Sequence, residues 1–362
     1  MAFHRAIFLS ASRFLPRAGI TLSLLAVAAI LAFPYAATAQ SVESFYKGRT
    51  VTLIIPTSPG GINNLSARLV SRHLGHFIPG NPTITVKNVP EGGGLGTANA
   101  FASTTPRDGS VIAVIQRAVP QLAIQGDPKA KFDPLKFTWL GSLSSFAGDA
   151  YMIVVNASYP AKTAADLKKP GPPAKFGADG IGSTNYTIGV VAKETLGYNL
   201  SVSPDYSGAA NIFKAMQGGE LDGQIIGLNS IRANQRAVWE GKTVRPLVQF
   251  GRTTRHPDLP DVPTARELTS DPQALAIIAF TELPFEMALP FMAPPDVPAD
   301  RATALQSGFA RMMQDADFLA DAKRSKLDIS PVSGEAVKAL LVKAAATPKD
   351  IIARYNTMTT KK

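Results

Sequence analysis

Three glycine-rich turns are the residues of this sequence best suited to bind a small ligand. They are residues 58–61 (SPGG), 91–96 (EGGGLG) and 180–185 (GIGSTN), and each follows a β-rich run and precedes an amphipathic stretch. Amides at a helix N-terminus point outward, and the helix dipole adds about half a positive charge there. For any one turn, the freedom of glycine to adopt positive φ is enough to explain why glycine occurs there. Because this type of turn occurs three times, we interpret the turns as an anion site lined by amides and hydroxyls.

Catalytic and metal-binding patterns are missing from the sequence. There is no Gly-x-Ser-x-Gly elbow, no His-Glu-x-x-His motif and no cysteine, which excludes thiol catalysis, iron–sulfur clusters and cysteine-based zinc sites. His73 and His76 lie three residues apart on a predicted helix, where packing explains them better than a metal does. Asp205, Glu220 and Asp222 are the remaining candidates for acid–base chemistry. We therefore expect no catalysis, no metal and no cofactor.

The elements that position these turns follow from the alternation of β-rich and amphipathic runs. This alternation is typical of an α/β architecture with mainly parallel strands. In such sheets ligands bind at the carboxyl edge, where the turns lie. The second element is expected to be a helix capped by Asn63 or Asn64. Strands are predicted at 50–56, 82–89, 110–115, 151–155, 175–178, 200–203, 223–226 and 244–250, and helices at 64–77, 96–104, 185–196, 209–217, 230–239, 301–314, 318–325 and 335–346.

The size of the chain predicts about two domains, and its first 39 residues have the pattern of an export signal. The 362 residues are 45% hydrophobic, enough for two cores at roughly 150 residues per domain. Three arginines precede the apolar run 18–33, and residues 37–39 (ATA) fit a signal peptidase site. Sixteen apolar residues fall short of the roughly 20 that span a bilayer. Cleavage before Gln40 is thus favoured over an uncleaved anchor, and a periplasmic protein without a lipid anchor is expected.

The charge of the chain does not indicate a nucleic-acid partner. Removal of residues 1–39 takes away three arginines and no acids, which lowers the formal net charge from +10 to +7. A nucleic-acid binder concentrates such charge into clusters interleaved with aromatic residues. The densest groups here, residues 245–255 and 323–326, are short and mixed. We therefore expect solvation of the surface, with weak steering of anions as the functional alternative.

Five groups of residues resemble, in order, the motifs of one known family. The opening strand and its turn come first, and the remaining groups follow along residues 45–345. The likeness is to the Bug or TctC-type extracytoplasmic solute receptors of tripartite tricarboxylate transporters. The groups are 45–56 (FYKGRTVTLIIP) with 58–61, 91–96 (EGGGLG), 106–109 (PRDG), 206–208 (YSG) with 219–222 (GELD), and 259–264 (LPDVPT).

The resemblance implies a type II periplasmic-binding-protein fold, an α/β fold in which two lobes close on a carboxylated solute. It also implies delivery of the solute to a two-subunit membrane permease, and a monomer is expected for a receptor that diffuses freely. On this basis lobe 1 is expected to comprise 40–148 plus 268–362, and lobe 2 to comprise 149–267. The ligand-binding positions that the resemblance implies are Ser58, Gly60, Gly61, Asn64, Gly93, Gly94, Leu95, Ser183, Thr184, Tyr206 and Asp222.

One departure from the family concerns the chemistry of the ligand. The family usually has an acid at the position of Asn64. Without that negative charge, the start of the helix should accept anionic groups more readily and suit an ammonium group less well. The sequence therefore predicts an organic acid over an amino acid. Four aromatic residues, Phe137, Trp139, Phe146 and Tyr151, either line the cleft or pack in the core, and the sequence leaves both open.

Two other functions are compatible with the sequence. The same closed form could dock onto a sensor of a two-component signalling system, so a ligand-binding sensor is the alternative to transport. A hydrolase on an α/β scaffold is the second rival. Turnover of a bound acid by the purified protein would distinguish this rival from a receptor.

Overall fold

The computed structural model describes residues 41–59, 61–206 and 208–360. The predicted export signal and Gly60 of the first glycine-rich turn lie outside the described residues. The chain divides into two units, Met1–Ser41 and Val42–Lys362, and every helix and strand of the described residues belongs to the second. Within the residues described, no helix combines the length and apolar character needed to cross a membrane.

The first sheet, sheet A, has six strands in the order β11-β4-β10-β3-β1-β2. Strand β1 lies between β2 and β3 and runs parallel to both, whereas β10 runs antiparallel to β3 and β4. Along β1, alternate residues Val51, Leu53 and Ile55 are fully buried, as expected for one apolar face of a pleated strand. The strands are β1 (Thr50–Ile55), β2 (Thr83–Asn88), β3 (Val111–Val114), β4 (Thr138–Ser142), β10 (Pro290–Ala293) and β11 (Val332–Ser333).

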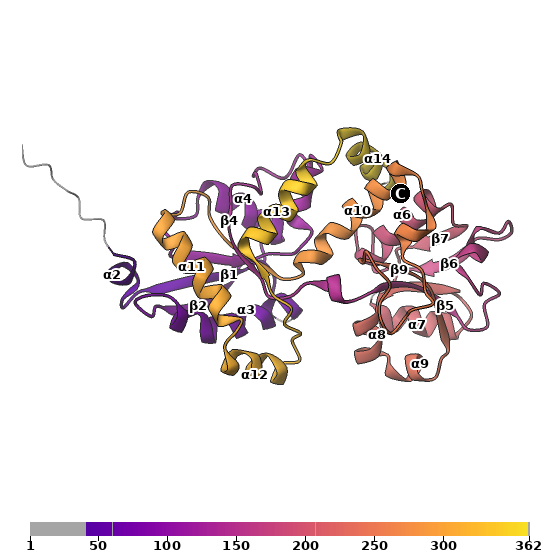
Figure 1. The fold of residues 1–362 in the computed structure, drawn as a ribbon, viewed down its shortest axis with the longest axis horizontal. Helices are drawn as coiled ribbons and strands as arrows, with labels where there is room; N and C mark the ends of the chain where they lie inside the picture. The colour runs from indigo at the N-terminus through magenta and orange to yellow at the C-terminus, as the bar shows by residue number, and fades with distance from the viewer. Residues whose placement is uncertain (1–40, 60, 207, 361–362) are drawn as a thin grey trace, which may run out of the picture. The chain divides into compact units, whose positions relative to one another are not determined.

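The second sheet, sheet B, has five strands in the order β7-β6-β8-β5-β9. Strand β6 pairs in parallel with β7 and β8, and β5 pairs antiparallel with β8 and β9. Figure 1 shows the strands of this sheet grouped apart from those of sheet A. The strands are β5 (Tyr151–Asn156), β6 (Ala174–Gly177), β7 (Leu200–Ser203), β8 (Gly223–Gly227) and β9 (Val244–Phe250).

The α/β class is confirmed, but the expectation of mainly parallel strands is wrong. Among the named strands of the described chain, four pairs are parallel and five are antiparallel. Each sheet has a parallel part that carries the glycine-rich turns, and the antiparallel pairs involve β5 or β10 and β11. The pattern of apolar residues reports how a strand is buried, not the direction in which its neighbours run.

Helices cover both faces of each sheet and build three apolar cores. One core joins β1 to α3, α11 and α12, and another joins β5 and β8 to α7, α8 and α9. A third core runs without interruption from sheet A to sheet B through α4, α13, α6, α10 and α14. Helices α10 and α14 lie beside α6 (Figure 1). The helices are α2 (Val42–Tyr46), α3 (Gly61–His73), α4 (Gly93–Ser103), α5 (Val119–Ile124), α6 (Thr184–Leu196), α7 (Ala209–Gln217), α8 (Leu228–Asn234), α9 (Arg236–Glu240), α10 (Pro272–Glu282), α11 (Ala299–Met312), α12 (Ala316–Arg324), α13 (Gly334–Ala345) and α14 (Lys349–Thr360), with short 3-10 turns η1 (Leu74–Phe77), η2 (Phe146–Gly148), η3 (Ala164–Lys168), η4 (Ala265–Leu268) and η5 (Leu283–Met287).

Two predicted helix starts are wrong in the same way. Helix α3 begins at Gly61 and α4 at Gly93, each three residues before the expected start. Asn63 and Asn64 therefore lie inside the first turn of α3 and do not cap it. In both cases a glycine of the turn forms the first helical residue. Before α4, Gly92 reverses the chain with a left-handed φ of 69°. The amides of the turns thus belong to helix N-termini.

Candidate functional site

Four buried polar atoms without partners belong to residues that follow the carboxyl ends of β1, β2 and β3. They are Thr57 Oγ1, Asn64 Nδ2, Thr97 Oγ1 and Gln116 Oε1, half of the eight such side-chain atoms in the described chain. A buried donor or acceptor without a partner costs about 1–3 kcal/mol, so native proteins leave few of them. A concentration at one sheet edge indicates a place built for a ligand or ordered water.

The first turn presents Asn64 at this edge. Asn64 is 95% buried on the first turn of α3, and its Oδ1 accepts a hydrogen bond of 2.8 Å from Arg68 Nε. Its Nδ2 has no partner within the described chain. Ser58 is exposed on the same turn, and Gly61 opens the helix. The first turn therefore offers an amide donor whose orientation is set by Arg68.

The second turn requires glycine because a side chain approaches it closely. Gly93 has a left-handed φ of 56°, and Gly94 is buried. A Cβ on Gly94 would overlap Gln116 Oε1, so the Gln116 side chain rests against the turn. Leu95 is half-buried one residue further along α4. The structure thus places the second turn and the end of β3 together.

The third turn uses its two hydroxyls differently. Ser183 is the N-cap of α6, and its Oγ accepts a hydrogen bond from Tyr186 N at 3.3 Å and donates to Gly180 O or Asn185 Oδ1. The hydroxyl of Ser183 is therefore occupied by the helix start. Thr184 Oγ1 instead accepts a hydrogen bond of 3.0 Å from the guanidinium of Arg117. Arg117 follows strand β3 of sheet A in the chain.

Tyr206 and Asp222 form hydrogen bonds with residues outside the three glycine-rich turns. The Tyr206 hydroxyl donates to Glu220 Oε1 at 2.5 Å, and this hydrogen bond raises the pKa of Tyr206 to about 12. Asp222 lies at the amino end of β8, where its Oδ2 accepts a bond from Lys175 N. Asp222 is thus at the opposite end of the strands from the third turn. The carboxylates considered for acid–base chemistry each have a separate partner, since Asp205 accepts from a serine of β7.

Arg117 is a candidate functional residue that sequence reasoning missed. It lies two residues beyond Ile115, at the carboxyl end of β3, and this position was the available signal. Its guanidinium carbon lies 5.1 Å from the ring centre of Phe146 and 5.6 Å from that of Phe285. A cavity of about 240 Å³ opens beside it. Of the described residues that line this cavity, which include Gly182 and Thr184, Arg117 is the only one with a formal charge.

The four aromatic residues divide between the core and the surroundings of Arg117. Phe137 and Trp139 are 4% and 1% exposed and pack in the central core. Phe146 lies against the Arg117 guanidinium, and Tyr151 stacks on Phe285, the second ring beside Arg117, with ring centroids 4.4 Å apart. Burial raises the pKa of Tyr151, and the neighbouring Arg117 opposes this rise. The arginine therefore stands in a partly apolar setting.

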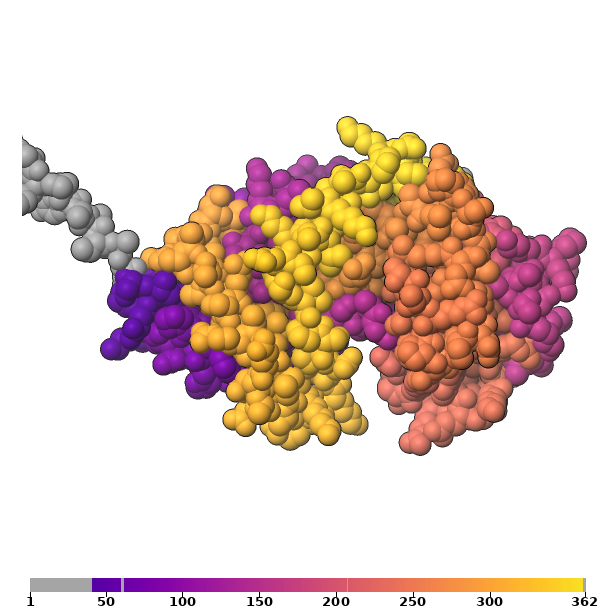
Figure 2. Space-filling model, in the orientation of Figure 1, coloured from indigo at the N-terminus to yellow at the C-terminus, as the bar shows by residue number. Residues whose placement is uncertain are grey.

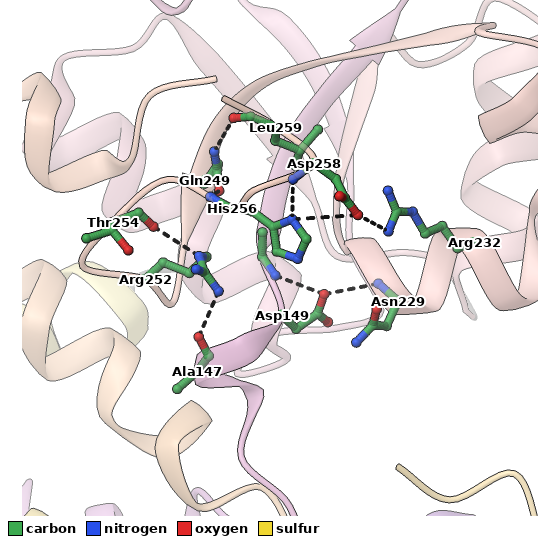
Figure 3. Close-up of polar contacts among 11 residues, drawn as sticks. Ala147, Asp149, Asn229, Arg232, Gln249, Arg252, Thr254, His256, Asp258 and Leu259 are labelled. Atoms are coloured by element: carbon green, nitrogen blue, oxygen red, sulfur yellow. Dashed lines mark hydrogen bonds and ion pairs between the residues drawn. The ribbon is translucent and has the colours of Figure 1, made fainter. Parts of the chain in front are cut away.

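A carboxylate of the protein itself occupies the start of α8. Asp149 Oδ1 accepts hydrogen bonds from Ala150 N at 2.8 Å and from Asn229 N at 3.0 Å (Figure 3). Burial raises the pKa of Asp149, and these two amides and the nearby His256 oppose this rise. Because an internal carboxylate already binds these amides, the start of α8 is less suited to an external anion than the start of α6.

Three segments of chain connect the two sheets beside the site. They join β4 to β5, η5 to β10, and α13 to α14. Arg252 Nη1 donates to Ala147 O in the first of these segments at 2.9 Å (Figure 3).

Figure 2 shows a notch in the surface between the gold segment that carries α12 and the salmon segment of α8 and α9. Among the described residues, no three His, Asp or Glu side chains gather as they would to hold a metal.

Comparison with known proteins identifies the family. The chain matches the model of the tripartite tricarboxylate transporter family receptor over residues 67–356. The chain belongs to this receptor family. It is 28% identical over 242 residues to a UPF0065 protein of Bordetella pertussis, which covers 66% of this chain and 72% of that protein. A UPF0065 protein of a Pseudomonas strain, from an intergenic region, is 27% identical over 248 residues, or 65% of this chain and 67% of its own length.

Solved structures of related receptors confirm the two-lobed periplasmic-binding fold. A TctC solute-binding protein from Polaromonas superposes with a TM-score of 0.65 at 19% identity, over 85% of this chain and 99% of that one. The periplasmic binding protein BugD gives a TM-score of 0.55 at 19% identity, over 86% of this chain and 99% of its own. The predicted family and fold are therefore confirmed.

Proposed function

We propose that this receptor captures a small organic carboxylate between two lobes and delivers it to the two-subunit permease of a tripartite transporter. The observation that carries the proposal is the group of unpartnered buried atoms at the ends of β1, β2 and β3. Asn64 Nδ2 and the Thr97 hydroxyl can donate to a carboxylate, and Gln116 Oε1 can accept from a ligand hydroxyl or a water. A carboxylate would satisfy atoms that are otherwise costly to bury.

Two related structures support the class of ligand. MatC from Rhodopseudomonas palustris, with malate bound, has a TM-score of 0.52 at 21% identity over 86% of this chain and 99% of its own. Another R. palustris protein, with adipate bound, has a TM-score of 0.54 at 18% identity over 85% and 98%. Both ligands are dicarboxylates. Binding and release of such an acid require donors and lobe movement, and no cofactor, metal or covalent chemistry.

The mechanical step that we propose is closure of the lobes. By the predicted bounds, lobe 1 comprises 40–148 plus 268–362 and lobe 2 comprises 149–267; we propose that α10 and α14, although within the lobe 1 range, belong to lobe 2. Helices α10 and α14 of the lobe 1 segment lie against α6 of lobe 2, and Glu282 at the end of α10 accepts hydrogen bonds from Gly251 N and Arg266. These helices would move with lobe 2, so bending would concentrate in the three connecting segments.

The cellular setting is also part of the proposal. Residues 1–39 would be removed during export, and the receptor would act in the periplasm as a monomer with no nucleic-acid partner. The apolar run 18–33 behind three arginines supports this setting. N-terminal sequencing of the protein recovered from the periplasmic fraction tests it. A chain that begins at Gln40 is expected.

A thermal-shift screen of the purified protein tests the ligand class. Monocarboxylates, dicarboxylates, tricarboxylates, aromatic acids and amino acids are compared. A ligand at 100 times its Kd adds about 2.7 kcal/mol to stability, which at roughly 2–4 °C per kcal/mol raises the Tm by about 5–11 °C. Three variants are screened as well: Ser183→Ala, Thr184→Ala and the control Ser201→Ala on β7. The Tm of each variant with ligand is compared with its own ligand-free Tm, because Ser183→Ala removes a helix cap. Thr184→Ala should reduce the ligand-induced shift, whereas Ser201→Ala should not; no shift with any acid would refute the proposal.

A further inference from the structure

We propose that Arg117 determines ligand selectivity by binding a second carboxylate, so that the receptor prefers dicarboxylates to monocarboxylates. This inference rests on the proposed function and specifies the class of ligand. The lobe 1 donors would hold one carboxylate near Asn64 and Gly94. The guanidinium, together with the start of α6, would hold the other.

The free hydrogen-bonding capacity of Arg117 is the first argument. A guanidinium has five N–H donors; one of them bonds to the Thr184 hydroxyl, and the Tyr151 hydroxyl is a second neutral hydrogen-bonding partner. Within the described chain Arg117 forms no ion pair, although its side chain is partly buried. Arg107 and Arg266, by comparison, pair with Asp296 and Glu282. A partly buried guanidinium without a carboxylate is suited to take one from a ligand, because Arg matches the planar geometry of a carboxylate.

The surroundings of Arg117 hold it in place. The rings of Phe146 and Phe285 lie within 6 Å of the guanidinium carbon, a distance at which cation–π attraction operates. The adjacent cavity has no acidic residue among its described lining, so a bound anion would meet no like charge there. Orientation before binding reduces the entropy that the ligand must overcome. These rings would also contact the apolar carbons between two carboxylates.

Two consecutive residues connect the two halves of the site. Gln116 rests against Gly94 of the second turn, and Arg117 bonds to Thr184 of the third turn. One anion group beside Gln116 and another beside Arg117 would therefore be separated by only a short distance along the backbone. A molecule with two carboxylates can reach both positions, whereas a monocarboxylate can use only one.

Calorimetric titration with a matched series of acids tests the inference. The series is butanoate, succinate, glutarate and adipate. Arg117→Gln should weaken binding of the preferred dicarboxylate about 10- to 100-fold, the effect of losing a charged hydrogen-bonding partner, and should change butanoate affinity less than threefold. The control Arg107→Gln, at an exposed arginine, should alter neither. Arg117→Lys keeps the charge but lacks the planar fork, so an intermediate loss of dicarboxylate affinity is expected.

The outcomes separate this inference from the proposed function. An equal loss for butanoate and the dicarboxylates, or no loss for either, would overturn the role of Arg117 while the receptor still binds acids. A wild-type protein that binds none of the four acids would overturn both. The ligand-free Tm of each variant shows whether it is folded. If Arg117→Gln does not fold, Arg117→Lys gives the same comparison of dicarboxylates with butanoate.

Discussion

Replacing Asn64 by aspartate restores the acid that the family usually has and separates two effects of this position. Asn64 lies on the first turn of α3, and its Oδ1 accepts a bond from Arg68 Nε at 2.8 Å. An aspartate there would pair with Arg68 and interact favourably with the helix dipole. We therefore expect Asn64→Asp to stabilise the ligand-free protein and to weaken binding of a carboxylate.

The magnitudes follow from these contacts. Charge at a helix N-terminus contributes about 0.3–1 kcal/mol, and the exposed Arg68 partner adds a similar or smaller amount. A loss of about 1 kcal/mol in binding corresponds to roughly a fivefold weaker Kd. Asn64→Ala removes the unpartnered Nδ2 donor instead. It should cost about 10- to 100-fold in affinity for a charged ligand.

Calorimetry with succinate and aspartate, together with the ligand-free Tm, measures these effects. In Asn64→Asp the ratio of aspartate to succinate affinity should rise, because a carboxylate at the helix start suits an ammonium group. Asn63→Ala is the matched control, since the hydrogen bond that this residue accepts from Ser66 involves its backbone oxygen. Succinate binding to Asn64→Asp that equals or exceeds wild-type binding would refute the reasoning.

Three further perturbations test other parts of the structure. Gly94→Ala should displace Gln116, whose Oε1 occupies the place of the new Cβ, and should weaken carboxylate binding; unchanged affinity by calorimetry would contradict this. Glu282→Ala should lower the free energy of unfolding in urea by about 1–3 kcal/mol, because Arg266 and the Gly251 amide lose their buried acceptor; a loss below 1 kcal/mol would argue against it. A hydrogen bond from His73, together with the neighbouring arginines, lowers the pKa of Asp321 below its ordinary 3.8. The stability that the Asp321 carboxylate contributes is therefore present above pH 3.8 and is lost as the pH falls through the lower pKa of the folded state. The Tm difference between wild type and Asp321→Asn should therefore shrink on acidification, and a difference that grows would contradict this sign.

Local pattern was sufficient for many elements of the fold. The limits of β7, β9 and α7 coincide with those predicted, because their apolar residues alternate or recur at the period of the element. The position of His73 was also predicted as packed, and it lies edge-on to Phe318 and contacts Asp321. In contrast, β4 and β10 were not predicted, since short buried strands lack a periodic pattern.

The sequence by itself determined that three glycine-rich turns precede helices, and hence that backbone amides are concentrated at sheet edges. That inference needs only neighbouring residues, because positive φ and helix starts are local properties. Tertiary structure decided which side chains join those turns. It brought Arg117 to Thr184, 67 positions apart in the chain, and placed Asp222 at the opposite end of the strands from the third turn. Strand order and direction, on which both placements depend, arise from packing between distant segments and leave no local mark on the residues themselves.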